Sequence, residues 1–173
     1  MHAYYFIHSL PMAQKRHLKP EESVCFCTKT TWHAISRLYN TTGAQHDVSA
    51  ATGFVLLNID AEKGTPATKI APALGMEPRS LTRMLKTMED KGYLERKSDA
   101  TDGRVMRIFL TDEGKKKREL AKIVVVAFNK AVREIVPTEK LDIYFEVANT
   151  INEIIDKKSI YDKVNVNQLG IKN

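Results

Sequence analysis

Apolar side chains recur at helical spacing through most of this chain. The clearest case lies between Pro78 and Gly92, where positions three or four residues apart form one apolar face, namely Leu81, Met84, Leu85 and Met88. Pro78 suits a first helical position because its missing N–H is not needed there, and Gly92 suits the residue after the last turn. The spacing therefore predicts a helix over residues 78–91 with an apolar face and a polar face.

Strand-like spacing follows that helix. Residues 93–97 and 104–110 alternate apolar with polar side chains, which is typical of half-buried strands. The connection between them contains Asp102–Gly103, a pair that favours a tight turn. With a shorter helical pattern before Gly75, the stretch 65–114 predicts the order helix, turn, helix and β-hairpin.

Helical patterns also precede this region. The segment Glu21–Ser23 gives an acidic start to a helix that we expect to run to about Thr42. Ser49 is a suitable N-cap for a strongly apolar helix that should end near Lys63–Gly64. Thr65–Pro66 would then provide the cap and first turn of the next helix.

Two long helical patterns follow the predicted hairpin. Thr111 can cap the first, with Asp112 and Glu113 in its first turn, where acidic side chains favour the positive helix end. The apolar stripe of this helix runs to Pro137, and Thr138 can cap a last helix. The apolar faces of both helices are broader than the central region can cover. They predict packing against the first helix and against a second copy of the chain in a two-fold dimer.

Positive charge is concentrated in the central region. The chain has 173 residues, a hydrophobic content of 43% and a formal net charge of +6, which fit one ordinary domain with a real core. Residues 65–118 hold 13 Lys/Arg and 8 Asp/Glu, so most of the positive excess lies there. A basic balance is compatible with nucleic acid, a membrane surface or an acidic protein partner.

Several classes of protein are disfavoured. No apolar run approaches the roughly 18 residues of a membrane-spanning helix, and the N-terminus lacks the positive start of a secretory signal. Cys25 and Cys27 are too close to suggest a disulfide framework and fit a reducing compartment, so we expect a cytoplasmic protein without a membrane partner. Histidines and cysteines form no ligand-spaced cluster, and there is no Gly-rich phosphate loop or nucleophile elbow. We therefore expect no enzyme activity, no cofactor and no metal.

Four motifs of the central region identify a family by their order and spacing. They are GMEPRSLTR at Gly75–Arg83, EDKGYLER at Glu89–Arg96, DATDGR at Asp99–Arg104 and LTDEG at Leu110–Gly114. These motifs resemble the recognition-helix start, the helix-to-wing junction, the wing motif Asp-x-Arg-Asp-x-Arg and the next helix start of the MarR family of transcriptional regulators. The resemblance implies a mainly α fold with a small β-hairpin wing, in which a winged helix-turn-helix is inserted between N- and C-terminal dimerisation helices.

The chain departs from the family pattern at two positions. Thr101 stands where the wing motif usually has its first arginine, so we expect one wing ion pair to be absent. Pro72 falls inside the first helix of the helix-turn-helix, where it removes a hydrogen bond and bends the helix. We expect that helix to be short or kinked, with the recognition helix after it intact.

The family resemblance divides the chain into four parts. They are an N-terminal extension (1–20), a helical dimerisation region (21–46 and 112–158), the winged helix-turn-helix (47–111) and a C-terminal tail (159–173).

The same resemblance implies a dimer that binds double-stranded DNA at a pseudo-palindromic operator, and we expect a repressor. Two equivalent recognition helices predict half-sites about 34 Å apart. The candidates for base or phosphate contacts in the major groove are Arg79, Ser80, Thr82, Arg83 and Lys86. Arg104 of the wing (93–110) would enter the minor groove or contact the backbone, positioned by Asp102 or Asp99. A surface ion pair is the alternative role for Arg104.

The family resemblance also implies release from DNA by a small aromatic or apolar effector. Such a ligand would fill a cleft beside the dimerisation helices, and the candidate lining residues are Trp32, Tyr39, Phe54 and Phe128. Apolar residues at helical spacing can equally be plain core.

Cys25 suggests a second kind of signal. In the organic-peroxide-sensing branch of the family, a similar Cys-Phe is followed fourteen residues later by a tyrosine, the spacing of Cys25 and Tyr39. A thiolate is the form that peroxide oxidises. Against a sensor, the acidic Glu21 and Glu22 precede the thiol, and Ala50 stands where that branch has a second tyrosine. Equal loss of operator affinity in Cys25→Ser and the parent after organic peroxide would exclude the sensor role.

Two alternatives to DNA reading follow from the same residues. The run Lys115–Arg118 is either a solvated helix face or a set of phosphate contacts beside the wing. The whole winged helix is alternatively a protein-interaction module. A steep salt dependence of duplex binding would favour DNA.

Overall fold

The computed structural model describes residues 19–99 and 101–157. Most of the predicted N-terminal extension (1–20) and all of the predicted tail (159–173) lie outside the described residues. The chain divides into two compact units, Thr31–Lys130 and a second unit formed by Met1–Thr30 with Ala131–Asn173. Its helices are α1 (Val24–Gly43), α2 (Ala50–Leu57), α3 (Ala67–Ala73), α4 (Pro78–Asp90), α5 (Asp112–Ile135) and α6 (Thr138–Asp156), with 3-10 turns at Pro20–Glu22 and Ala44–His46.

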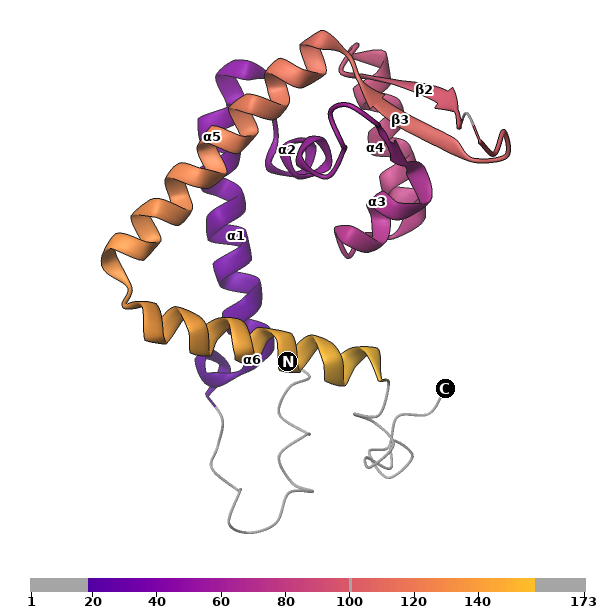
Figure 1. Cartoon of the computed structure of the whole chain (residues 1–173). Helices are drawn as coiled ribbons and strands as arrows, with labels where there is room; N and C mark the ends of the chain where they lie inside the picture. The colour runs from indigo at the N-terminus through magenta and orange to yellow at the C-terminus, as the bar shows by residue number, and fades with distance from the viewer. Residues whose placement is uncertain (1–18, 100, 158–173) are drawn as a thin grey trace. The chain divides into compact units, whose positions relative to one another are not determined.

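A small antiparallel sheet provides the wing (Figure 1). It contains β1 (Thr65–Pro66), β2 (Leu94–Ser98) and β3 (Met106–Leu110) in the order β1-β3-β2. The ladder between β2 and β3 runs from Leu94 opposite Leu110 to Ser98 opposite Met106. The predicted mainly α fold with a β-hairpin wing is therefore confirmed.

The prediction for Thr65–Pro66 was wrong. These residues form the third strand of the sheet, where Thr65 lies opposite Ile108 and Pro66 opposite Arg107. Pro66 is tolerated because β1 is an edge strand, and its missing N–H costs no ladder bond there. Thr65 does not cap a helix, since its hydroxyl oxygen accepts a hydrogen bond from the N–H of Asp60 at 2.9 Å.

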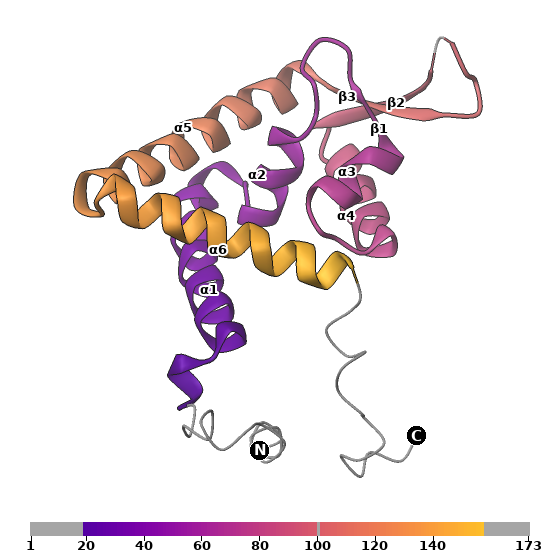
Figure 2. The same ribbon diagram turned by 60° about the horizontal axis from the view of Figure 1, so that its bottom comes forward.

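The core of the Thr31–Lys130 unit lies between α2, α3, α4 and the sheet, and Figure 2 shows these elements from a second side. Burial of apolar surface in such a core is the main favourable term in folding. The predicted apolar face of α4 contributes Leu81, Leu85 and Met88 to it. The largest fully buried side chains are Leu56, Ile59, Ile70, Met88, Ile108 and Val55.

Helix α2 begins as predicted but ends earlier. The hydroxyl of Ser49 accepts a hydrogen bond from the N–H of Thr52 at 3.1 Å, which confirms the N-cap. The helix ends at Leu57 instead of near Lys63–Gly64. The reason is a tight turn in which Asp60 Oδ1 accepts hydrogen bonds from the N–H groups of Glu62 and Lys63, at 2.9 and 2.8 Å.

The two helices of the helix-turn-helix follow the sequence closely. Helix α3 has 7 residues and contains Pro72, so the prediction of a short first helix is confirmed. It ends at Ala73, and Gly75 follows its C-cap residue with a φ of 59°, in the left-handed region that glycine tolerates. Helix α4 ends at Asp90, and Gly92 follows its C-cap residue in the same way with a φ of 71°.

Helix starts differ from prediction at two other places. Glu21 and Glu22 lie in the 3-10 turn before α1, and the hydroxyl of Ser23 accepts a hydrogen bond from the N–H of Phe26 at 3.2 Å. Helix α6 has Pro137 at its N-cap, so Thr138 is its first residue and does not cap it. A proline at that place starts a helix through its fixed φ instead of a side-chain hydrogen bond.

The start of α5 is held against the base of the wing by hydrogen bonds of Thr111 and by the close packing of Gly114. The hydroxyl of Thr111 accepts a hydrogen bond from the N–H of Gly114 at 3.0 Å, as predicted for an N-cap, and donates to the carbonyl of Gly92 at 2.6 Å. The N–H of Thr111 also donates to the carbonyl of Tyr93 at 3.2 Å. Gly114 packs so closely that a Cβ added there would overlap the carbonyl oxygen of Tyr93.

Gly114→Ala should therefore destabilise the fold by about 2 kcal/mol or more, since a backbone shift at the wing base is the only way to admit the methyl group. Gly103→Ala is the matched control, because nothing lies within 4 Å of a Cβ at that position. Its unfolding free energy should stay within about 0.5 kcal/mol of the parent. Urea unfolding at one fixed protein concentration measures both. Equal stabilities of the two variants would contradict the close approach.

Candidate nucleic-acid interface

The face of α4 opposite the core is exposed and basic. It carries the predicted contact residues Arg79, Ser80, Thr82, Arg83 and Lys86, all of them exposed. Within residues 19–99 and 101–157, the guanidinium groups of both arginines have no hydrogen bond or ion pair. The hydroxyl of Thr82 donates to the carbonyl of Pro78 at 2.9 Å, and Lys86 Nζ lies 3.5 Å from Asp90 in an exposed pair.

Arg104 lies in the exposed turn between β2 and β3. Asp102 orients its backbone, because Asp102 Oδ1 accepts a hydrogen bond from the N–H of Arg104 at 3.0 Å. In the described part of the chain, neither Asp102 nor Asp99 pairs with the guanidinium of Arg104. The expected positioning through a side-chain pair is therefore absent, and the guanidinium is unpaired in this part of the chain.

Asp99 pairs instead with Arg107 of β3, a residue that the sequence analysis did not single out. Arg107 Nε and Nη2 donate to Asp99 Oδ2 at 2.8 and 2.6 Å. Hydrogen bonds from the side chain and backbone of Thr101, and then from Arg107, hold the pKa of Asp99 well below its usual range. The wing thus has an ion pair although Thr101 replaces the arginine of the motif.

The basic run at the start of α5 is divided between two roles. The side chains of Lys117 and Arg118 are only 19% and 24% exposed, and each pairs with a glutamate at 3.2 Å, Glu113 and Glu119 respectively. Lys115 and Lys116 are more exposed, in looser pairs at 3.4 and 3.6 Å. Only the latter two are accessible enough to be candidates for phosphate contacts.

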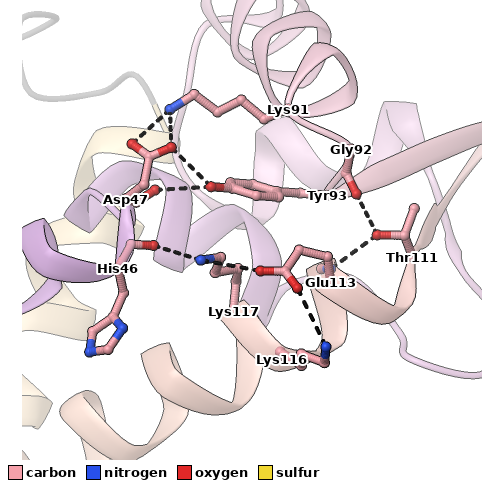
Figure 3. Close-up of polar contacts among 10 residues, drawn as sticks. His46, Asp47, Lys91, Gly92, Tyr93, Thr111, Glu113, Lys116 and Lys117 are labelled. Atoms are coloured by element: carbon pink, nitrogen blue, oxygen red, sulfur yellow. Dashed lines mark hydrogen bonds and ion pairs between the residues drawn. The ribbon is translucent and has the colours of Figure 1, made fainter.

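A polar junction ties the α1–α2 connection to the end of α4 and the start of β2 (Figure 3). Lys91 Nζ donates to both carboxylate oxygens of Asp47, at 2.9 and 2.7 Å, and the Tyr93 hydroxyl donates to Asp47 Oδ2 at 3.0 Å. The hydrogen bond from Lys91, then that from Tyr93, lowers the pKa of Asp47, and the same pairing raises the pKa of Lys91. Burial, with the hydrogen bond to Asp47, raises the pKa of Tyr93.

Lys117 adds α5 to this junction (Figure 3). Its ammonium group donates to the carbonyl of His46 at 2.9 Å and lies 5.6 Å from the centre of the Tyr93 ring. These contacts join α1–α2, α4, β2 and α5 at one place in the Thr31–Lys130 unit. None of them was predicted, since each pairs residues far apart in the sequence and no local pattern marks them.

The predicted effector residues lie in one row of ring contacts. Trp32 and Phe54 have centroids 5.5 Å apart, Tyr39 and Phe54 5.9 Å, and Tyr39 and Phe128 5.7 Å. Tyr39 and Phe54 also line a hollow of about 20 Å³ between α1, α2 and α5. That volume holds about one water molecule, so the rings fill most of the space in this conformation. Burial raises the pKa of Tyr39.

Three further predictions concern Cys25, metal binding and membrane-spanning helices. Cys25 is exposed near the start of α1, and its role as a sensor stays a prediction. Across residues 19–99 and 101–157, no group of three or more His, Cys, Asp or Glu residues is arranged to hold a metal. None of the helices in that part of the chain is long and apolar enough to cross a membrane.

Asp47→Asn should lower the unfolding free energy at pH 7, because the amide cannot form the ion pair with Lys91. The lowered pKa of Asp47 means that its stabilisation is present above the ordinary value of 3.8 and is lost as the pH falls through the folded value. The stability gap between parent and variant should therefore narrow below about pH 4. Asp142→Asn, an exposed change on α6, is the control and should show no such gap. A gap that is the same at pH 7 and in acid would refute the role of the charge.

Comparisons with known proteins agree with this arrangement. Residues 48–106 match the model of the MarR family. The chain is 33% identical over 95 residues to the HTH-type transcriptional regulator TtmR of Methylorubrum extorquens, a match that covers 55% of this chain and 49% of TtmR. It thus spans about half the length of that relative. It is 28% identical over 134 residues to the HTH-type transcriptional regulator SarZ of Staphylococcus saprophyticus, covering 77% and 90% of the two chains.

Solved structures share the fold. The transcriptional repressor CouR bound to a 23-mer DNA duplex superposes with a TM-score of 0.65 at 24% identity, covering 78% of this chain and 98% of CouR. CouR from Rhodococcus jostii bound to p-coumaroyl-CoA gives a TM-score of 0.67 at 18% identity, covering 77% and 94%. Both sequence relatives are named as HTH-type transcriptional regulators. The matched family model, the order of the four motifs and the observed fold identify residues 48–106 as a winged helix-turn-helix of the MarR family.

Proposed function

We propose that this protein is a dimeric repressor that binds a pseudo-palindromic operator in double-stranded DNA and leaves it when a small aromatic or apolar effector binds. Helix α4 reads the major groove, and the wing contacts the minor groove or the backbone. The observation that carries the proposal is the exposed basic face of α4, whose Arg79 and Arg83 have no partner elsewhere in the described residues.

Like-charged arginines on one exposed helix face repel weakly, and an anionic partner would relieve that repulsion. Arg79 and Arg83 lie four residues apart, where like charges repel by a few tenths of a kcal/mol. Their planar donors match guanine in the major groove, and one bidentate pair discriminates between bases by about 1–3 kcal/mol. The buried opposite face of α4 fixes the helix in place, so these side chains are presented from a rigid element.

Arg104 supports the role of the wing. Its guanidinium is exposed and unpaired within residues 19–99 and 101–157, and Asp102 fixes the backbone that carries it. An arginine at the tip of a β-hairpin can enter a narrow minor groove, where the potential is most negative. The domain boundaries proposed for the winged helix-turn-helix remain residues 47–111.

Exposed apolar side chains support a dimer. Ile135 of α5 is 81% exposed, and α6 exposes apolar or aromatic side chains along much of its length, namely Ile143, Tyr144, Phe145, Val147, Ile154 and Ile155. Near the start of α1, Val24 and Phe26 are exposed as well. Large exposed apolar patches are rare on soluble monomers and mark a binding partner, and we propose that these side chains form such a patch. A second copy is the partner that the paired recognition helices also require.

An effector site is proposed at the hollow beside Tyr39 and Phe54. The solved ligand complex of CouR is consistent with effector binding in this fold. The hollow has room for about one water molecule, so an aromatic ligand would have to displace the packed rings, and their movement would shift α2. A screen of aromatic and apolar acids for release of bound duplex tests this. The proposal fails if compounds that bind the protein leave its DNA affinity unchanged.

The DNA contacts can be tested with a duplex enriched by in vitro selection from a random library. Arg83→Ala should weaken binding to that duplex by about 1–3 kcal/mol and reduce its preference over random DNA. Lys86→Ala should weaken binding to both duplexes about equally and lower the salt slope by about one. Lys140→Ala, which removes an exposed lysine of α6, is the control.

The same titrations separate the proposal from a protein-interaction module. A dimer that enriches no duplex, and binds none even at low salt, would favour the module. A loss of affinity in Lys140→Ala as large as that in Arg83→Ala would also contradict a role for α4.

Pairing of two copies has its own test. Ile143→Glu places a charge on the exposed apolar face of α6, and burying an unpaired charge is strongly unfavourable. The variant should sediment as a monomer at concentrations where the parent is a dimer, with loss of operator binding. Asn149→Glu adds the same charge at an exposed polar position and should remain dimeric. A parent that sediments as a monomer would exclude the proposed assembly.

A further inference from the structure

The carboxylate of Asp99 binds two sets of donors at the wing. Oδ1 accepts hydrogen bonds from the N–H and the hydroxyl of Thr101 at 2.8 and 2.6 Å, and from the N–H of Asp102 at 3.3 Å. Oδ2 accepts from Nε and Nη2 of Arg107 at 2.8 and 2.6 Å. One side chain therefore both shapes the turn and holds the guanidinium of β3.

The other edge of the same guanidinium reaches a different segment. Nη1 of Arg107 donates to the carbonyls of Lys63 and Gly64, at 3.2 and 3.1 Å. The backbone at Gly64 lies against β3, because a Cβ added there would be 2.7 Å from the carbonyl oxygen of Ile108. Arg107 thus joins the wing turn to the loop between α2 and β1.

These contacts lie at the last position where the sheet has three strands. Arg107 is opposite Pro66 of β1 and Lys97 of β2. Beyond it only β2 and β3 continue, their ladder ends with Ser98 opposite Met106, and the turn with Arg104 follows. A two-stranded hairpin is marginally stable by itself. The Arg107 and Asp99 side chains are only 26% and 10% exposed, and a charge-assisted pair with two donors in such surroundings is stronger than an exposed one.

We propose that Arg107 is a positioning residue for DNA binding, which fixes the wing turn and its Arg104 by bridging Asp99 to the Lys63–Gly64 loop. It supplies from β3 the ion pair that Thr101 cannot make. This inference rests on the proposed DNA-binding function. Arg107 acts through Arg104 and need not touch the DNA itself.

The net charge of the variants distinguishes the proposed positioning role from a purely electrostatic effect on DNA affinity. Asp99→Asn makes the protein more positive, so electrostatics alone would tighten its binding to DNA. Under the proposal, the same change releases Arg107 and the turn, and binding weakens. Arg107→Met removes the other partner, and Lys97→Met is the matched control, since Lys97 lies opposite Arg107 on β2 and its loss removes the same charge.

The experiment measures affinity, salt slope and hydroxyl-radical protection on the selected duplex. Asp99→Asn and Arg107→Met should each weaken binding by at least about fivefold and lower the salt slope by about one. Protection of the sugars that flank the major-groove contacts should be lost, and protection at the α4 contacts should remain. The double variant should bind no worse than Arg107→Met, because both changes break one pair. Lys97→Met should keep the flanking protection.

Folding is checked by circular dichroism and thermal unfolding, and binding is measured well below each unfolding midpoint. A purely structural role would reduce the active fraction and leave the salt slope and the protection pattern of the bound protein unchanged.

Arg107→Lys keeps the charge without the two-pronged geometry and should lose the same flanking protection. The inference would be overturned if Asp99→Asn bound the selected duplex as tightly as the parent or more tightly. It would also be overturned if Arg107→Met and Lys97→Met had the same affinity and the same flanking protection. Failure of the parent to select any duplex would instead overturn the proposed function.

Discussion

A close backbone approach between Tyr93 and Gly114 fixes the base of the wing to the start of α5. The hydroxyl of Thr111 donates a hydrogen bond to the carbonyl of Gly92, and its N–H donates to the carbonyl of Tyr93. Both ends of the hairpin therefore meet at one point. A side chain at position 114 would occupy the space of the Tyr93 carbonyl oxygen. The orientation of the wing relative to α5 within the Thr31–Lys130 unit depends on this contact, because no larger residue permits it.

The polar junction extends the same constraint to the recognition helix. Lys91 directly follows α4, and Tyr93 directly precedes β2 of the wing. Both side chains bind Asp47 in the connection between α1 and α2. Lys117 brings α5 to the same connection through the carbonyl of His46. A shift of α1 or α5 would therefore displace the contacts made by Lys91 at the end of α4. We propose this junction as the link between an effector beside α1, α2 and α5 and the recognition helix.

The charges of this chain fall into two groups. Lys91, Arg107 and Lys117 pair with carboxylates or carbonyls and maintain the fold. Arg79, Arg83 and Arg104 have no such partners in the described residues and remain available to an anion. Net charge alone could not separate these groups, since every one of these residues adds equally to the formal charge of +6. The match of residues 48–106 to the MarR family model is the reason for proposing DNA as the partner of the second group.

Local patterns in the sequence were enough to predict the order of the helices, the hairpin, the Ser49 and Thr111 caps, and the exposed face of α4. These features follow from the repeat of 3.6 or 2 residues and from local turn chemistry, which act over a few neighbouring positions. Only the tertiary structure revealed the third strand, the early end of α2, the Asp47 junction and the Arg107 bridge. Lys91 and Asp47 are 44 positions apart, as are Arg107 and Lys63. Pairs at such separation leave no periodic signal, because the fold alone brings their side chains together.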